Sequence, residues 1–296
     1  MPRYMHFGKE GEGPLGRGPG LVPVRGTLHQ GDLNLRDDLK KDKIRTYYRA
    51  LFQAWGPQNW WPARSRFEVI VGAYLTQNTA WTNVEKALAN LRIAGVLSVK
   101  GIRDLRLAEL ERLIQPSGYF RQKAARLKTF IGFLDRQHQG SRKRLFVRPT
   151  ADLRKELLAL NGVGPETADS ILLYAGNHPV IVVDAYTRRI LARHAILPEE
   201  ANYEDLRGLF ERALSPLAES AADSREASTQ NQPAGLPGGP HPPSAMSTLK
   251  RTALTQVYNE MHGLIVGVGK HYCKKREPLC KSCPLYAFLP KRRTET

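Results

Sequence analysis

Residues 157–194, LLALNGVGPETADSILLYAGNHPVIVVDAYTRRILARH, decide the fold that the sequence predicts. A leucine-rich segment ends at Leu160, and the Gly162-Val163-Gly164 sequence that follows predicts a tight turn, because glycine adopts positive φ without a steric penalty. A second helix is expected over residues 167–175, where the apolar residues fall on one stripe. The segment therefore predicts two short helices joined by a glycine-rich turn.

This arrangement of helix, turn and helix is suited to binding a phosphate. The N–H groups of the turn and of the following helix N-terminus form a concave surface that is rich in donors and partly positive. Such a surface holds one position of a nucleic-acid backbone without reading bases. The alternative is an ordinary pair of antiparallel helices with a glycine turn, and Gly162-Val163-Gly164 alone does not decide between the two.

Asp184 stands at the start of the next predicted helix, a basic one over residues 185–193. In one interpretation it is an N-cap that accepts a hydrogen bond from the backbone N–H of Tyr186 or Thr187. In the other it is a carboxylate held at a fixed point beside a nucleic-acid backbone. The two interpretations are compatible, because a capped carboxylate is also a positioned one.

The composition favours a polyanionic partner. Lys and Arg total 45 against 28 Asp and Glu, a net charge of +17 that is typical of nucleic-acid binding, although a basic protein of another purpose would show it too. Three cysteines do not suit a secreted disulfide scaffold, and the N-terminal residues lack the apolar core of a signal peptide. No apolar run approaches a membrane span. We expect an intracellular protein of the cytoplasm or nucleoid, with no membrane partner.

The segments LNGVGPETADSILLYA and VVDAYTRR resemble the endonuclease III superfamily of DNA glycosylases, which is defined by a helix-hairpin-helix, a Gly/Pro-rich loop and an aspartate. Asp184 matches the catalytic aspartate of that superfamily. The resemblance covers about residues 42–214 and 250–289. It implies a DNA-binding surface that includes Gly162, Val163, Gly164, Thr167 and Arg188.

Glu166 departs from the pattern of the bifunctional members of this superfamily. They carry a nucleophilic lysine 18 residues before the catalytic aspartate, which is the position of Glu166 relative to Asp184. A glutamate cannot form a Schiff base, so lysine-dependent strand cleavage is not expected. The glutamate resembles the 3-methyladenine branch, whose members are monofunctional. Glu166 is expected to line the base pocket and to act in catalysis through the base or water.

A polar interruption follows the apolar helix that is predicted over residues 67–75. In the superfamily the matching loop carries a glutamine that fills the gap left by the flipped base, and the resemblance gives this role to Gln77. Without the resemblance, a helix-capping loop is the simpler interpretation. Asn78 and Trp81 are expected along the same groove. The pair Trp60-Trp61 is expected to pack rather than to stack on bases.

Residues 118–124, GYFRQKA, resemble the superfamily segment that opens a further helix. Arg121 and Lys123 are basic residues of this segment that could contact phosphate. Solvent-exposed surface is the simpler interpretation for any single charge. In either interpretation the two side chains are expected at the surface.

The three cysteines form the pattern Cys273-x6-Cys280-x2-Cys283. They match the first three positions of the iron–sulfur loop of many endonuclease III relatives, and thiolates at this spacing can bind a [4Fe–4S] cluster. The position of the fourth cysteine is Leu289, which cannot bind iron. Three interpretations stay open: a cluster with an incomplete thiolate set or a further ligand such as His271, a loop without metal, and a Cys3His zinc site that uses His271.

The fold class that these features predict is all-α, with two helical lobes, the helix-hairpin-helix architecture of DNA glycosylases and a C-terminal cysteine loop. One lobe is expected over residues 64–179, and the other combines an N-terminal helix within residues 37–63 with residues 180–290. Disorder is expected in residues 1–36 and in an insertion at 215–247, where small and polar residues cannot bury enough apolar area to offset the entropy of ordering.

The function that these features favour is hydrolysis of the N-glycosidic bond of a damaged base in double-stranded DNA, by a monomer. Alkylated purines are the substrate class that the resemblance favours. Two alternatives stay open: a bifunctional glycosylase and AP lyase acting on oxidised pyrimidines, and a damage-binding protein without catalysis. The first needs an amine nucleophile, and the second does not need the carboxylate of Asp184.

Overall fold

The computed structural model describes residues 30–223 and 241–290, and every regular element in these two ranges is a helix. This confirms the all-α class. The longer helices are α1 (Gln30–Trp55), α2 (Arg66–Leu75), α3 (Trp81–Ile93), α6 (Phe120–His138), α11 (Tyr203–Asp223) and α12 (Ala253–His271). The shorter helices are α4 (Val99–Asp104), α5 (Leu107–Ile114), α7 (Arg142–Phe146), α8 (Thr150–Leu158), α9 (Pro165–Ser170) and α10 (Ala185–Arg193).

Four single turns complete the set of elements. Three are 3-10 turns, η1 (Gln115–Ser117), η3 (Cys280–Ser282) and η4 (Tyr286–Phe288). The fourth, η2 (Ile171–Gly176), is a π-helical turn that continues α9 directly. Within the described ranges no helix is long and apolar enough to cross a membrane.

Helix α2 lies at the centre of the core. It is buried along residues 67–75, and a helix that is apolar on every side belongs in an interior. Ser65 caps its N-terminus by accepting the N–H of Glu68. Glu68 is 3% exposed and pairs with Arg92 of α3 at 2.8 Å, so the one acidic side chain of the helix is neutralised. This buried helix leads directly into the loop that carries Gln77.

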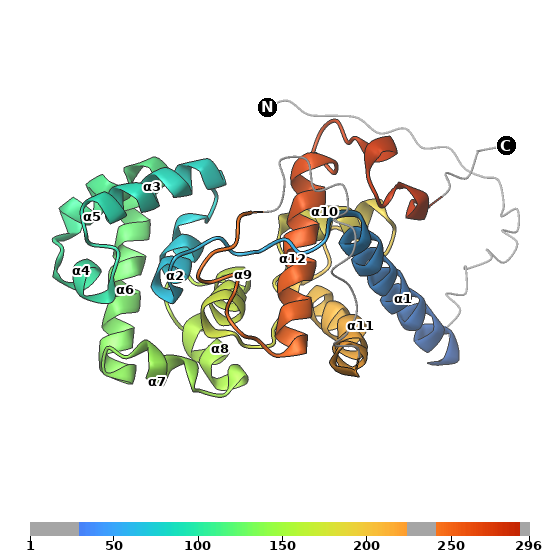
Figure 1. Ribbon diagram of the computed structural model, residues 1–296, viewed down its shortest axis with the longest axis horizontal. Helices are drawn as coiled ribbons and strands as arrows, with labels where there is room; N and C mark the ends of the chain where they lie inside the picture. Colours follow the sequence, from blue (N-terminus) through green and yellow to red (C-terminus); the bar gives the residue numbers. More distant parts are fainter. Residues whose placement is uncertain (1–29, 224–240, 291–296) are drawn as a thin grey trace, which may run out of the picture. The chain divides into compact units, whose positions relative to one another are not determined.

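The contacts between helices fall into two sets (Figure 1). In one set α2 packs on α3 and α6, and α4 and α5 pack on α6. In the other set α12 packs on α10 and α11. Helix α1 joins the second set, because the Tyr47 hydroxyl and His194 Nδ1 are 2.7 Å apart. The turn η2 contacts both α2 and α12 and so connects the two sets. The lobe boundaries near residues 63 and 179 remain a prediction.

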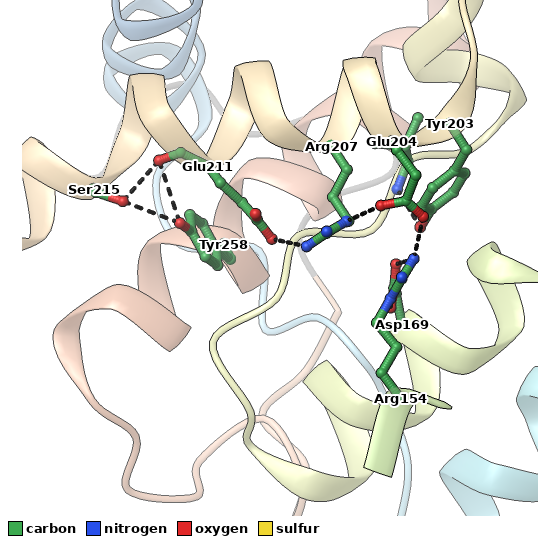
Figure 2. A network of polar contacts seen from close by, with 9 residues as sticks. Arg154, Asp169, Tyr203, Glu204, Arg207, Glu211, Ser215 and Tyr258 are labelled. Atoms are coloured by element: carbon green, nitrogen blue, oxygen red, sulfur yellow. Dashed lines mark hydrogen bonds and ion pairs between the residues drawn. The ribbon is translucent and has the colours of Figure 1, made fainter. Parts of the chain in front are cut away.

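A chain of ion pairs holds the hairpin helices α8 and α9 to α11 (Figure 2). Arg154 of α8 donates to both carboxylate oxygens of Asp169 on α9, from Nε at 2.7 Å and from Nη2 at 3.2 Å. The same guanidinium group donates to Glu204 of α11 at 2.6 Å, and Glu204 also pairs with Arg207. Asp169 is fully buried, and removing one partner of such a pair destabilises a protein by about 3–5 kcal/mol. The placement of the two hairpin helices therefore depends on Arg154.

Tyr203 connects this network to the segment that precedes Asp184. Its hydroxyl accepts the N–H of Val183 at 3.3 Å and hydrogen-bonds the carboxylate of Asp169. The connector of residues 180–183 is apolar and at most 2% exposed. Asp184 therefore follows a buried connector that is tied, through one hydroxyl group, to the hairpin.

Two predicted boundaries of disorder differ from the structure. Helix α1 begins at Gln30 rather than near Asp37, because residues 30–37 contain no proline and a helix propagates readily from a packed part. Helix α11 continues to Asp223, past the predicted start of the insertion. Its apolar face extends beyond Pro216, with Ala218 8% exposed, and this packing outweighs the roughly 3 kcal/mol that a proline costs in a helix interior.

The end of the predicted insertion is also ordered. Met246 is 3% exposed and its N–H donates to the carbonyl oxygen of Ala63 at 3.2 Å. Residues 241–247 therefore belong to the folded part. Residues 1–29 and 224–240, where disorder was also predicted, lie outside the described residues.

Candidate functional site

Gly162 and Gly164 adopt different conformations in the hairpin turn. Gly162 has a φ of 77°, which favours glycine, and a Cβ atom there would lie 2.0 Å from Nε of Arg126. Gly164 has extended backbone with a φ of −88°, and a Cβ atom there would meet no atom of the described residues within 4 Å. The predicted turn is confirmed, but only its first glycine needs the left-handed conformation. The second glycine leaves open space in front of the N-terminus of α9.

Asp184 is the N-cap of α10, as one of the two interpretations predicted. Its Oδ1 accepts hydrogen bonds from the backbone N–H and from the hydroxyl of Thr187, both at 2.8 Å. The Thr187 oxygen in turn accepts the N–H of Asp184, which completes a reciprocal capping box. The side chain of Asp184 is 12% exposed. It is therefore neither free in solvent nor sealed in the apolar core.

The pKa values of Asp184 and Glu166 shift in opposite directions. Burial alone would raise the pKa of Asp184, but the nearby His262 and the donors of Thr187 outweigh burial and lower it. The pKa of Glu166 is raised to about 7, first by the atoms that crowd its carboxyl group and second by the charge of Asp184, although the residue as a whole is exposed. Near neutral pH one carboxyl group is thus ionised while the other exchanges a proton, an arrangement that gives two carboxyl groups different roles.

Sequence reasoning missed His262 and Tyr174. Nε2 of His262, on α12, lies 3.6 Å from Oδ2 of Asp184, and Nδ1 is hydrogen-bonded to the hydroxyl of Tyr174 on η2. His262 is 6% exposed and Tyr174 is 1% exposed. Both belong to apolar helical segments that predict packing alone, and His262 follows Asp184 by 78 residues (262 − 184). The available signal was a single histidine within an apolar helix.

Gln77 lies against the hairpin turn. Its Nε2 donates to the carbonyl oxygen of Gly162 at 3.0 Å and to Oγ1 of Thr167 at 2.9 Å. Its Oε1 accepts a hydrogen bond from Nη1 of Arg126 at 2.6 Å. The amide group therefore uses both of its donors and an acceptor within the protein. A loop and a hairpin that were predicted from separate stretches of sequence are in direct contact.

Lys123 is buried, which corrects the prediction of a surface position. It is 1% exposed, and its ammonium group donates to the carbonyl oxygens of Leu75 at 2.9 Å and Ser117 at 2.6 Å. Burial lowers the pKa of Lys123 to about 8. The carbonyl groups at a helix end have no partner within the helix, and the ammonium group supplies one. Lys123 therefore fixes the end of α2, just before Gln77 and the exposed Asn78.

The tryptophans follow the packing interpretation to different degrees. Trp61 is 5% exposed, and its ring centroid lies 5.0 Å from that of Trp81 and 5.2 Å from that of Tyr174. Trp81 is therefore part of an aromatic cluster. Trp60 is half-buried and lies edge-on to His262, with ring centroids 6.4 Å apart. It is the tryptophan that reaches the site.

Two arginines of α10 interact with different parts of the protein. Arg188 donates to the carbonyl oxygen of Ala201, and its charge opposes the rise in the pKa of Glu166. Arg189 donates to the carbonyl oxygen of Cys273 at 2.6 Å. Of these two arginines, the predicted DNA contact Arg188 is the one whose charge acts on Glu166.

The three cysteines line one cavity together with Leu289. The cavity has a volume of about 20 Å³, which is room for about one water molecule. Within the ranges that the structure describes, no three side chains of His, Cys, Asp or Glu are gathered so as to hold a metal ion. A [4Fe–4S] cluster contains four iron and four sulfide ions and takes four ligands. The residues present do not fit such a cluster, because the position of the fourth thiolate is the apolar Leu289.

His194, rather than His271, is the histidine beside the cysteines. His194 lines the same cavity, but its Nδ1 is already bonded to the Tyr47 hydroxyl. His271 does not line the cavity, and burial together with the charge of Lys270 lowers the pKa of His271. His271 is therefore not placed as a fourth ligand.

Comparison with known sequences identifies the family. A family model described as "HhH-GPD superfamily base excision DNA repair protein" matches residues 71–216, which include Gln77, the hairpin and Asp184. A protein of Methanocaldococcus jannaschii that is described as a candidate DNA repair glycosylase is 37% identical over 250 residues, which are 84% of this chain and 96% of its own length. Endonuclease III of Thermotoga maritima is 24% identical over 217 residues, 73% of this chain and 79% of its own. The chain belongs to the HhH-GPD superfamily of base excision DNA repair proteins.

Solved structures share the fold. The H. pylori 3-methyladenine DNA glycosylase bound to 1,N6-ethenoadenine matches with a TM-score of 0.60 and 28% identity, over 78% of this chain and 97% of its own. A trapped endonuclease III–DNA covalent intermediate matches with a TM-score of 0.58 and 20% identity, over 83% of this chain and 93% of its own. These likenesses confirm the predicted architecture of helix-hairpin-helix DNA glycosylases.

Proposed function

We propose that this protein is a monofunctional DNA glycosylase that hydrolyses the N-glycosidic bond of a damaged base in duplex DNA. The observation that carries the proposal is the capped, partly exposed carboxylate of Asp184, whose charge contributes to the raised pKa of Glu166. The pair supplies an anion for a cationic sugar, and a glutamate provides no amine for a Schiff base. Membership of the superfamily and 28% identity to a 3-methyladenine DNA glycosylase support the assignment.

The hairpin turn is proposed to hold one phosphate of the damaged strand. The open space in front of Gly164 admits an anion to the N–H groups of the turn. Asn78, Thr167 and Arg188 are proposed to complete the contact surface. The net charge of +17 favours this partner, and the binding is expected to weaken steeply as salt rises, because neutralising phosphates releases counterions.

Gln77 is proposed to fill the gap that the flipped base leaves. The base must leave its stack, which takes a few kcal/mol and favours lesions that are already weakly paired. Gln77 would then exchange its hydrogen bonds with Gly162, Thr167 and Arg126 for contacts within the DNA. Before DNA binds, the Gln77 amide is therefore fully hydrogen-bonded within the protein.

Asp184 is proposed to stabilise the sugar as the C1′–N bond breaks and the base departs with the bonding electron pair. A water molecule then forms the new bond to C1′ and gives up a proton to a carboxylate. Glu166 has a pKa of about 7, which suits a proton acceptor or donor near neutral pH. Alkylated purines are the proposed substrates, because their positive charge makes them good leaving groups opposite two carboxyl groups.

A panel of duplexes that each carry one lesion tests the proposal. Free base is measured by chromatography for alkylated purines, 1,N6-ethenoadenine, oxidised pyrimidines and undamaged controls. We expect release of alkylated purine, a loss of about 100- to 1,000-fold in Asp184→Asn, as for removal of a key transition-state contact, and an unchanged Kd for DNA.

Borohydride trapping separates the alternatives. No covalent DNA adduct is expected. An adduct together with release of oxidised pyrimidines would identify a bifunctional lyase. Release that is equal in the wild type and in Asp184→Asn would remove Asp184 from catalysis, and tight binding of damaged DNA without any release would identify a damage-binding protein.

A further inference from the structure

His262 links two side chains that come from other helices. It lies on α12, and its two ring nitrogens point at different partners. Nδ1 is hydrogen-bonded to the hydroxyl of Tyr174 on η2, and Nε2 faces Oδ2 of Asp184 at 3.6 Å. Among the described residues, Nε2 has no partner within hydrogen-bond distance although it is buried. A buried polar atom of this kind calls for a functional explanation.

Tyr174 determines where the hydrogen of the imidazole ring lies. Burial raises the pKa of Tyr174 well above its usual value, so the hydroxyl keeps its proton. When this hydroxyl donates to Nδ1, a neutral ring carries its own hydrogen at Nε2. A protonated ring carries hydrogens on both nitrogens. In both states an N–H group of His262 is directed at Asp184.

The two oxygens of Asp184 have separate surroundings. Oδ1 is occupied by the N–H and the hydroxyl of Thr187 at 2.8 Å. Oδ2 faces His262 at a distance longer than a hydrogen bond, so it keeps a lone pair for another partner. Because the carboxylate is only 12% exposed, it needs nearby donors to stay ionised.

We propose that His262, oriented by Tyr174, is a positioning residue for Asp184: its Nε2–H group keeps the carboxylate ionised and directs Oδ2 towards the deoxyribose of the flipped nucleotide. This inference rests on the proposed glycosylase function. It assigns no proton transfer to His262, which acts on the reaction only through Asp184.

Other charged groups also act on the residues of this arrangement. Glu166 of α9 interacts with both His262 and Asp184, and Arg188 of α10 interacts with Glu166. Arg251, just before α12, lowers the pKa of Tyr174, and Glu260, on α12, raises it. Glu166 has a pKa of about 7, within the working range, so each variant has to be compared with the wild type at the same pH.

Two substitutions of His262 separate its two contacts. The amide nitrogen of a glutamine can occupy the place of Nε2, so His262→Gln keeps a donor facing Asp184. The amide of an asparagine reaches only the place of Nδ1, so His262→Asn keeps the contact with Tyr174 and loses the donor. Tyr174→Phe keeps the aromatic packing on Trp61 and removes the hydroxyl group.

The first experiment measures single-turnover base release from pH 4 to 8 and divides the rate of each variant by that of the wild type at the same pH, so that the titration of Glu166 cancels. For His262→Gln this ratio is expected to vary less than about threefold, because Asp184 stays ionised. For His262→Asn the ratio is expected to fall by up to about tenfold towards acid pH, since an Asp184 pKa that is one unit higher leaves about a tenth as much carboxylate below both midpoints. The ratio for Tyr174→Phe should fall less than that for His262→Asn and more than that for His262→Gln. Equal, pH-independent losses in the Gln and Asn variants would show a packing role and overturn the proposal.

The second experiment needs no activity. Carbon-13 NMR of the side-chain carboxyl groups, with the Asp184 signal assigned by its absence in Asp184→Asn, gives the titration midpoint directly. The midpoint is expected to rise by about one unit or more in His262→Asn, as for loss of a neighbouring donor or charge, and to stay within half that in His262→Gln. An unchanged midpoint in His262→Asn would refute the proposal, whereas a shifted midpoint in a protein that releases no base would refute only the glycosylase function.

Nitrogen-15 NMR of the wild-type His262 ring tests the proposal even if the variants do not fold. The His262 signals are expected to show a hydrogen at Nε2 throughout the pH range. A neutral ring with its hydrogen at Nδ1 would contradict the arrangement and overturn the proposal by itself.

Discussion

Asp184 is contacted by Thr187 of α10 and by His262 of α12, whereas Cys273, Cys280 and Cys283 line one small cavity. The first group is completed by His262, a partner that the motif does not contain. The second group lacks its fourth thiolate, because Leu289 stands at that position. Both regions keep the spacing of their motifs, so spacing alone does not distinguish a complete site from an incomplete one.

The two regions also differ in how firmly they are tied to the core. The hairpin is fixed by the buried pair Arg154–Asp169 and by the contact of Gln77 with Gly162. In the cysteine segment, Arg193 of α10 donates to Sγ of Cys273 at 3.1 Å, and Cys280 and Cys283 are only partly buried. Substitutions in the hairpin should therefore have larger effects than substitutions in the cysteine segment.

The largest effect on stability is expected at the first glycine of the hairpin. Gly162→Ala forces a residue with a Cβ into φ of 77° and against Arg126, which should lower the free energy of unfolding by about 1–3 kcal/mol. Gly164→Ala is the matched control, because its φ of −88° and open surroundings predict a change below about 0.5 kcal/mol. Urea denaturation measures both.

For DNA binding, unlike for stability, Gly164→Ala should have a clear effect. The methyl group of Gly164→Ala enters the open space where a phosphate is proposed, so its Kd for duplex DNA is expected to rise severalfold without a loss of stability. An unchanged Kd for Gly164→Ala would place the phosphate elsewhere, and a stable Gly162→Ala variant would mean that Arg126 and the turn adapt.

A smaller effect is expected from Glu166→Gln, and it depends on pH. The carboxyl group loses its proton near pH 4.5 in the unfolded chain and near 7 in the folded protein. Raising the pH from 4.5 to 7 therefore favours the unfolded chain, and Glu166→Gln removes this loss of stability. The variant should match the wild type below pH 4.5 and exceed it above pH 7 by less than about 1 kcal/mol, because solvent screens an exposed group. Denaturation at pH 4.5, 6 and 8 tests the sign, and a gap that narrows with rising pH would contradict it.

The smallest effect is expected at the half-exposed Cys280. Cys280→Ser should change the free energy of unfolding by less than about 0.5 kcal/mol, because the side chain is neither buried nor bound in a complete site. Leu289→Cys is the complementary variant, since it restores the four-thiolate pattern. Anaerobic reconstitution with iron and sulfide should give an iron–sulfur absorbance band in Leu289→Cys alone. A band of equal strength in the wild type would show that three thiolates suffice.

Much of the candidate site could be predicted from local sequence. Gly162-Val163-Gly164 and Pro165 specify a turn and a helix start through backbone geometry, and Asp184 specifies an N-cap, so both were found from short segments. Lys123 was misplaced because a lysine in an amphipathic helix gives no sign that two helix-end carbonyl groups await it. His262 was missed because its significance arises from the Tyr174 hydroxyl and the Asp184 carboxylate, which lie far from it in the chain.

The sequence by itself determined the helical class, the hairpin, the capped aspartate and the glutamate in place of a lysine, because each depends on backbone preferences or spacing within about 20 residues. The tertiary structure decided which side chains surround these elements. It brought His262 to Asp184, Gln77 to the hairpin and Leu289 to the cysteines, since packing between distant helices sets those neighbours. The charge state of a carboxyl group depends on such neighbours, and that is why the pKa values of Asp184 and Glu166 diverge only in the folded protein.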